Sequence, residues 1–267
     1  DAIRLENPIS DDTTMMRPHL LMGLLRNVSS NVRRFIEDVR LFEVGKAFGK
    51  SMAESLFEEP RLGFVLYGRR LPGNWSGGQA AVDFYDAKAV AESLLAYLAA
   101  TPFHFIPTVS RPFLETGKAA EILKDGECVG WVGAVRREMA QALDIPGTAY
   151  YGEIRIAAAT ASESPARKHR AMPKFPPVFR DIACILPEHV PVGDVLAMVS
   201  ELTTEIESAV VFDIFTGEKI GEGSKSVAFR VKIQPMDRTL TDAEVNSIHT
   251  KIVKLLENRF GGKIRSS

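Results

Sequence analysis

The stretch of this chain that comes closest to a phosphate-binding loop is residues 217–226, GEKIGEGSKS. A P-loop requires a glycine directly before its Lys-Ser pair, and it joins a strand to a helix. Here Ser224 stands in the place of that glycine, and the segments on both sides have the pattern of strands. The sequence therefore predicts no nucleotide site in this loop.

The side chains that most often bind metals or act as nucleophiles show no productive spacing. The two cysteines, Cys128 and Cys184, lie far apart, whereas a zinc cluster needs closely spaced Cys and His. No nucleophile elbow of the GxSxG type occurs either. We therefore predict no catalytic residue and no metal site in this chain. The histidines, which share no metal-ligand spacing, are His19, His104, His169, His189 and His249.

One strand-like stretch places an aromatic and an acidic side chain on the same face. In residues 210–215, VVFDIF, side chains alternate, so that Asp213 and Phe215 share one face and Phe212 points to the other. An exposed aromatic ring stacks on nucleic-acid bases, and a carboxylate accepts hydrogen bonds from base donors. A plainer interpretation also fits, with Phe215 in the core or singly exposed, Asp213 as a turn cap and Lys225 as a solvated charge.

The elements that position this strand belong to residues 174–267. A capping box of Thr241 and Glu244 begins the last helix, and Gly261 with Gly262 ends it. The predicted order βαββαβ is that of the ferredoxin-like split βαβ fold. We predict strands at 179–186, 210–215, 226–233 and 263–266, with helices at 192–206 and 241–260.

Residues 1–157 predict a separate domain built on an antiparallel sheet, and residues 158–173 a linker. The Lys124-Asp125-Gly126 turn between two strand patterns indicates a hairpin. The whole chain is therefore predicted to be α+β, with one domain at 1–157 and a second at 174–267. The strands are expected at 39–48, 61–67, 103–106, 119–123, 127–135 and 149–157, with helices from about 15 to 33, ending near 99, and at 136–143.

Composition sets only broad limits on function. A chain of 267 residues is long enough for two domains, and an apolar content of 45% supports two cores. The net charge of −1 shows no overall basic bias, although it does not exclude a local basic patch. No apolar run approaches the roughly 18 residues of a membrane span, so we expect no membrane partner. The distant cysteines suggest buried thiols in a reducing cytoplasm, and a first residue of Asp1 leads us to expect missing N-terminal sequence.

Several short sequence motifs resemble those of one known family. KFPPVFRDIA at 174–183, FDIFTG at 212–217, GEGSKSVAF at 221–229 and RTLTDAEV at 238–245 resemble the ferredoxin-fold anticodon-binding domain of bacterial phenylalanyl-tRNA synthetase β subunits. In the first half, NPIS at 7–10, MRPHLLMGLL at 16–25, RLFEVGKAF at 40–48 and VDFYDAK at 82–88 resemble the same subunit's class II synthetase-like module. One segment differs from the family pattern: residues 113–120, FLETGKAA, stand where members usually carry a His-Pro-Gly-containing segment.

The resemblance implies a set of RNA contacts in the second domain. It assigns anticodon contacts to Asp213, Phe215 and Ser226, with phenylalanine at a position where members often carry tyrosine. The basic side chains that we expect to contact phosphates are Lys225, Arg180 and Arg238.

The resemblance also implies that the first domain is catalytically silent. Arg40 and Glu43 stand where a motif-2-like strand would place them, but no glycine-rich GxGxGxxR strand follows, so we expect a structural pair or an interface contact. The implied partners are tRNA and a catalytic α subunit in an α2β2 heterotetramer, with ATP and Mg²⁺ bound mainly by α, no cofactor in this chain and no DNA. The alternative function is a stand-alone RNA- or protein-interaction module with no role in charging.

Overall fold

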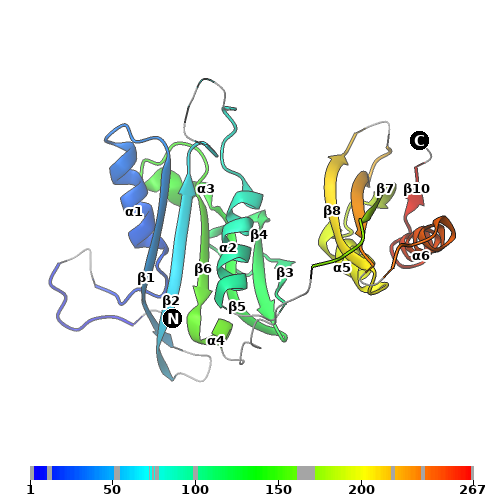
Figure 1. The fold of residues 1–267 in the computed structure, drawn as a ribbon. Coiled ribbons are helices and arrows are strands. Elements are labelled where there is room, and N and C mark those ends of the chain that lie inside the picture. Colours follow the sequence, from blue (N-terminus) through cyan, green and yellow to red (C-terminus); the bar gives the residue numbers. More distant parts are fainter. Residues whose placement is uncertain are drawn as a thin grey trace. The chain divides into compact units, whose positions relative to one another are not determined.

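A computed structural model describes residues 3–10, 14–50, 55–71, 73, 75, 78–98, 102–160, 172–217, 220–235 and 238–265. The chain divides into two compact units, Asp1–Arg167 and Lys168–Ser267, each of which carries its own sheet (Figure 1). Both sheets are antiparallel and both are packed against helices, which confirms the α+β prediction. No helix among the described residues is long and apolar enough to cross a membrane.

The first unit is built on a six-stranded antiparallel sheet in the order β1-β2-β6-β5-β4-β3. Asp125 and Gly126, both with positive φ (50° and 83°), form the predicted tight turn between β4 and β5. The short helix α4 begins within the strand predicted at 149–157 and extends to residue 160, inside the predicted linker. The elements are α1 (Leu21–Val32), β1 (Val39–Lys50), β2 (Leu56–Tyr67), α2 (Phe84–Leu98), β3 (His104–Pro107), β4 (Leu114–Lys124), β5 (Glu127–Val135), α3 (Arg137–Ala142), β6 (Tyr150–Arg155) and α4 (Ile156–Thr160).

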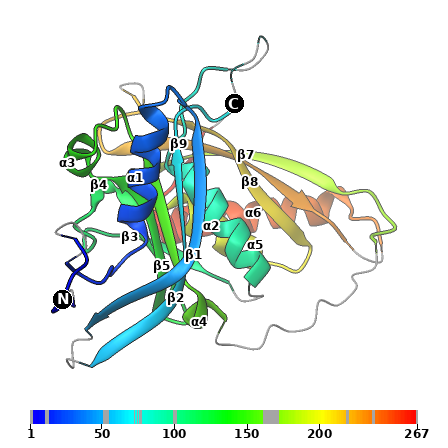
Figure 2. The same cartoon turned by 90° about the vertical axis from the view of Figure 1, so that its left-hand side faces the viewer.

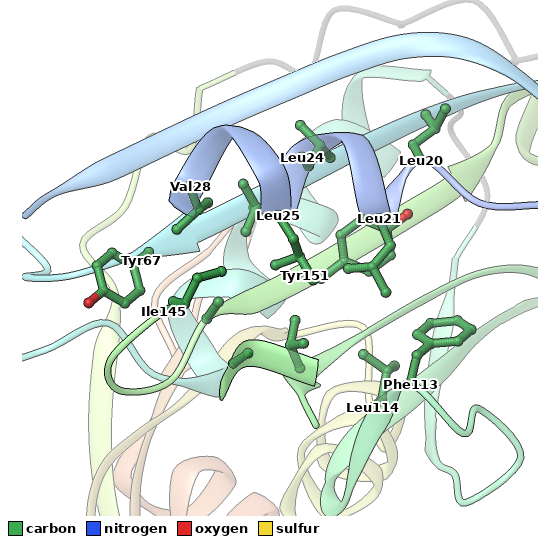
Figure 3. Packing of buried hydrophobic residues seen from close by; sticks show 14 of the residues in the cluster. Leu20, Leu21, Leu24, Leu25, Val28, Tyr67, Phe113, Leu114, Ile145 and Tyr151 are labelled. Atoms are coloured by element: carbon green, nitrogen blue, oxygen red, sulfur yellow. The ribbon is translucent and has the colours of Figure 1, made fainter. Parts of the chain in front are cut away.

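Helices cover both faces of this sheet. Val65 and Tyr67 of β2 pack in the cluster that contains the apolar side chains of α1, while the neighbouring Phe64 and Leu66 pack in the cluster that contains α2. Adjacent residues of a strand point to opposite faces, so α1 and α2 lie on opposite sides of the sheet. Figure 3 shows the buried stripe of α1 against the sheet. The β1–β2 hairpin continues past the end of β6, where residues 56–60 pair with β1 alone (Figure 2).

The second unit has the predicted βαββαβ order and a four-stranded sheet in the order β10-β7-β9-β8. The capping box at the start of α6 is present, since the Thr241 hydroxyl accepts from the Glu244 amide and the Glu244 carboxylate accepts from the Thr241 amide. Gly261 (φ 62°) ends that helix in the left-handed conformation. The elements are β7 (Val178–Pro187), α5 (Val192–Glu201), β8 (Ile206–Phe215), β9 (Ser224–Ile233), α6 (Asp242–Phe260) and β10 (Lys263–Ile264).

Candidate nucleic-acid interface

One face of the second sheet is packed against helices, and the other face is open. Val227, Phe229 and Val231 of β9 are fully buried in a core with apolar residues of α5 and α6. Because side chains alternate along a strand, Ser226, Ala228, Arg230 and Lys232 point to the opposite face. We call this second face the open face, since helices α5 and α6 both pack on the other side of the sheet.

The strand register brings the three predicted anticodon contacts together on the open face. Phe215 of β8 lies opposite Ser226 of β9, and Asp213 lies opposite Ala228, its neighbour on the same face. Phe215 remains 47% exposed, whereas Ser226 is only 6% exposed. Ser226 lies in the inner strand β9, between Phe215 of β8 on one side and Ile185 of β7 on the other, which leaves little of its surface accessible.

Asp213 and Phe215, but not Ser226, border a pocket of about 380 Å³, which is lined by Ile185, Asp213, Phe215, Ile220 and Arg265. The sequence patterns did not indicate Arg265, which follows β10 and reaches this place because its backbone amide donates to the carbonyl of Ala183 (2.9 Å). Small side chains stand behind the pocket, with Ala183 directly opposite Ala228 in the register of β7 and β9. The pocket combines an aromatic ring, a carboxylate and a guanidinium, which is a set suited to a planar base next to a phosphate.

Phe212 lies on the open face, so the prediction that it points to the other side was wrong. Val211 pairs with Phe229 and Asp213 with Ala228, so Phe212 is an extra residue in β8, a β-bulge. Such a bulge interrupts the alternation of side chains and places two successive residues on one side. Accordingly, the Phe212 ring is 58% exposed and lies 5.8 Å from the guanidinium carbon of Arg230.

The open face also carries an ion pair that the sequence patterns did not indicate. Arg230 of β9 donates from Nε to Asp181 Oδ1 (2.6 Å) and from Nη2 to Oδ2 (2.7 Å). The hydrogen bonds from Arg230 hold the pKa of Asp181 below its usual value. A bidentate pair fixes the plane of the guanidinium, so Arg230 stands in one orientation beside Phe212.

The three predicted phosphate contacts do not gather on the open face. Lys225 points to the helix-covered side and its ammonium donates to the carbonyls of Glu188 (2.8 Å) and Val190 (2.6 Å). Burial of this ammonium lowers its pKa. Arg180 alternates with Asp181 and so shares the side of the core residue Ile182.

Arg238 lies ahead of α6, where its Nη1 donates to Glu244 of the capping box (2.5 Å). For Arg238, as for Lys225 and Arg180, the phosphate contact stays a prediction, and for Lys225 the structure offers another role: it ties the loop after β7 to β9.

Arg40 and Glu43 of β1 do not form a pair with one another. Arg40 donates to the backbone carbonyls of Arg69 (2.7 Å) and Arg70 (2.5 Å), and Glu43 pairs with Arg17 (2.6 Å). The two residues are three positions apart on a strand and therefore point to opposite faces. A motif 2 arginine binds a phosphate through its guanidinium group. The guanidinium group of Arg40 instead donates to backbone carbonyls of its own unit.

A buried ionic cluster lies in the first unit, on the face of the sheet that α1 covers. Glu153 of β6 has no exposed surface, and its carboxylate accepts from Arg61 (2.6 Å), from the backbone amide of Leu20 (2.8 Å) and from the hydroxyl of Tyr151. Burial pushes the pKa of Glu153 upward, but His19, whose Nδ1 lies 3.7 Å from the carboxylate, and the hydrogen bonds from Tyr151, Leu20 and Arg61 bring the pKa below its usual value. A carboxylate with this many donors is a structural anchor rather than a proton-transfer group.

Comparisons with known proteins are consistent with this geometry. A family model described as the phenylalanyl tRNA synthetase beta chain CLM domain matches residues 1–156, and one described as a ferredoxin-fold anticodon binding domain matches residues 173–265. The phenylalanine–tRNA ligase beta subunit of Dechloromonas aromatica is 36% identical over 275 residues, which cover 100% of this chain and 33% of that protein. The subunit of the same name from Moorella thermoacetica is 32% identical over 266 residues, 99% of this chain and 33% of that protein.

The chain thus spans about one third of the length of the curated relatives that it matches. The solved structure of pyrrolysyl-tRNA synthetase from Desulfitobacterium hafniense has a TM-score of 0.43 and 14% sequence identity, covering 59% of this chain and 51% of that chain. So distant a likeness carries no argument about the site.

Proposed function

Since this chain belongs to the family of phenylalanyl-tRNA synthetase β chains, we propose that it forms part of the β subunit of a phenylalanine–tRNA ligase and binds the tRNA anticodon. The observation that carries the proposal is the pocket on the open face, where Asp213, Phe215 and Arg265 converge. This pocket lies in the part of the chain that matches the anticodon-binding family.

Three side chains of the pocket have separate tasks in binding an unpaired nucleotide. Stacking on the half-exposed ring of Phe215 contributes about 1–3 kcal/mol per base and tolerates any base. The Asp213 carboxylate accepts from N–H groups of a base edge and so supplies the selection between bases. Arg265 neutralises a backbone phosphate and adds affinity that weakens with salt.

The first unit serves as a scaffold for a catalytic α subunit, in an α2β2 assembly in the cytoplasm. The names of the relatives, beta subunits of phenylalanine–tRNA ligase, support the existence of such a partner. The engagement of Arg40 with two backbone carbonyls supports a silent module, because phosphate binding would require this fork to be open. In this assembly ATP and Mg²⁺ are bound mainly by the α subunit, and no chemical step falls to this chain.

The test is binding of an anticodon stem-loop of phenylalanine tRNA by the full-length protein, with a stem-loop of changed anticodon beside it. Asp213→Ala and Phe215→Ala are each expected to weaken cognate binding about tenfold, because each removes one direct base contact. Asp213→Ala should also reduce the preference for the cognate loop. Phe179→Ala is the matched control, since Phe179 is an equally exposed aromatic on the open face, at the other end of β7.

The same variants separate RNA binding from chemistry. Adenylate formation, followed by ATP–pyrophosphate exchange in the assembled enzyme, should be unchanged by Asp213→Ala and Phe215→Ala. Intact charging of tRNA together with slower adenylate formation would show that the proposal is wrong. Purification without any partner subunit would instead support a stand-alone interaction module.

A further inference from the structure

A second pocket lies in the first unit, along the C-terminal half of α1. It has a volume of about 470 Å³ and is lined by Arg26, Ser29, Ser30, Arg33, Arg34 and Leu143. The first four of these follow the spacing i, i+3, i+4, i+7 and therefore form one stripe of the helix. The buried leucines of α1 point to the sheet instead (Figure 3), so the arginines of this stripe, which are exposed, stand at the surface.

The charge of this pocket is largely uncompensated. Arg33 pairs with Asp144, which follows α3, at 2.8 Å, and both side chains are exposed. The guanidinium groups of Arg26 and Arg34 form no ion pair or hydrogen bond within the described part of the chain. The lining of the pocket thus carries three exposed guanidinium groups, which can only donate hydrogen bonds, and the partly exposed hydroxyl of Ser30, whereas Ser29 is buried. Guanidinium forks match phosphate oxygens bidentately.

An aromatic residue in an unfavourable backbone conformation directly follows Arg34 in the chain. Phe35 has a φ of 63° and a side chain that is 93% exposed. Its amide donates to the carbonyl of Val32 (2.9 Å), and that of Ile36 to the carbonyl of Asn31 (3.1 Å), which is the hydrogen-bond pattern of a Schellman motif. The left-handed residue of that motif is usually glycine, because a side chain there is strained. Phe35 thus carries strain without any compensating burial, a combination that points to function.

We propose that this pocket and Phe35 form a second RNA-binding site, separate from the open face. Arg26, Arg33 and Arg34, with the hydroxyl of Ser30, bind backbone phosphates, and Phe35 stacks on an unpaired or terminal base. The choice of RNA rests on the proposed function, which makes tRNA a partner of this protein. An acidic protein segment would use the arginines alone, whereas RNA uses both the arginines and the fully exposed ring.

The test compares full-length tRNA with the isolated anticodon stem-loop, both binding to the full-length protein in its complex over a salt series. The double variant Arg26→Glu/Arg34→Glu should weaken tRNA binding at least tenfold. It should also lower the slope of log K against log salt by about 1.4, since each phosphate contact contributes about 0.7 with single-stranded RNA. Binding of the stem-loop should be unchanged. The matched control is Lys251→Glu/Lys254→Glu, which makes the same change of charge on exposed positions of α6.

Substitutions of Phe35 test the stacking contact. Phe35→Ala should weaken tRNA binding about tenfold, and Phe35→Trp should restore it. If the α1 and α6 double variants lose equal amounts of tRNA affinity, the effect is one of overall charge and the proposed site is wrong. No loss of tRNA binding from the α1 variants would also overturn it, as would efficient displacement of tRNA by poly-glutamate together with unchanged binding by Phe35→Ala. If the reversal variant melts early, Arg26→Gln/Arg34→Gln repeats the comparison.

The outcomes for the two RNA sites are distinguishable. If the proposed function is wrong, Asp213→Ala and Phe215→Ala leave the affinity for the stem-loop unchanged. If only the second site is wrong, the α1 variants leave the affinity for tRNA unchanged, whereas Asp213→Ala and Phe215→Ala still weaken binding of the stem-loop.

Discussion

At the scale of single residues, the non-glycine residues with a left-handed backbone differ in how well their side chains tolerate that conformation. Asp125 (φ 50°) and Asp144 (φ 55°) lie in turns, where a short polar side chain tolerates this conformation. Phe35 (φ 63°) is bulky and aromatic, and its ring contributes nothing to the core. Stability alone would therefore favour glycine or asparagine at position 35.

Phe35→Gly is expected to raise the free energy of unfolding of the first unit by about 0.5–1 kcal/mol. The left-handed strain disappears, and part of this gain is offset by the greater freedom of glycine in the unfolded chain. Urea unfolding can be followed by tryptophan fluorescence, because Trp75 and Trp131 both lie in the first unit. Phe35→Asn should act in the same direction. A lower urea midpoint for both variants would show that the ring stabilises the fold.

At the scale of elements, one buried carboxylate connects a helix to the sheet. Glu153 of β6 accepts from the Leu20 amide, immediately before α1, and from Arg61 of β2. The Arg61 guanidinium also donates to the carbonyl of Pro18 (3.0 Å), so the entry of α1 is held at two points. This arrangement sets the position of the α1 stripe that carries Arg26 and Arg33.

Glu153→Gln is expected to destabilise the first unit by about 3 kcal/mol at pH 7, because it removes one of the two carboxylates paired with the buried Arg61, the other being Glu59, and replaces a fully buried acceptor of several hydrogen bonds with a neutral amide. The folded state holds the pKa of Glu153 below its ordinary value of 4.5. Such a group stabilises the fold above the pKa of the unfolded chain, and the contribution is lost as the pH falls toward the folded pKa. The difference between wild type and Glu153→Gln should therefore shrink below about pH 4.5.

Urea midpoints measured by tryptophan fluorescence between pH 3 and pH 8 check this dependence. Glu121→Gln serves as the control, since its partner Arg111 is more accessible to solvent than Arg61. A difference that stays constant with pH would contradict the ionised state of Glu153.

Another element-scale feature is the bulge in β8, which enlarges the open face. Without the extra residue, Phe212 would alternate away from Asp213, and the open face would carry a single ring on this strand. With the bulge, Phe212 and Phe215 both lie on the open face, and the guanidinium of Arg230 is held near the first of them. The bulge therefore gives the open face two exposed rings on one strand, which under the proposed function could stack on more than one base.

At the scale of the whole molecule, the two units have separate cores. The clusters beneath α1 and α2 draw all their residues from the first unit, and the cluster beneath α5 and α6 draws all its residues from the second. Apolar burial is the main stabilising contribution in each, so each unit has the means to fold by itself.

Ile252→Ala, at a fully buried position of α6, should lower the unfolding free energy of the second unit by about 2–5 kcal/mol. Its effect should be visible in far-UV circular dichroism and absent from the tryptophan fluorescence transition, which reports the first unit. Ile122→Ala, at a fully buried position of β4, is the matched change in the first unit and should shift the fluorescence. A fluorescence midpoint that moved equally with Ile252→Ala would show that the units unfold together.

The sequence by itself determined the type and order of nearly all the elements and the family of the chain. Helical spacing, strand alternation, the Thr241 capping box and the turn at Asp125 are local signals, so they can be read without the rest of the fold. The same strand pattern, with the family resemblance, was enough to expect Asp213 and Phe215 on one face, and the resemblance added Ser226.

Only the tertiary structure decided which distant residues meet. A register shift in β8 turned Phe212 to the open face, and the pairing of β10 with β7 brought Arg265 into the lining of the same pocket as Asp213. The partners of Arg40 and Glu43 likewise depend on where other segments pack. These outcomes escape sequence patterns because periodicity describes neighbours along one element, whereas a one-residue bulge or a pairing across the sheet is selected by burial and hydrogen bonding among segments far apart in the chain.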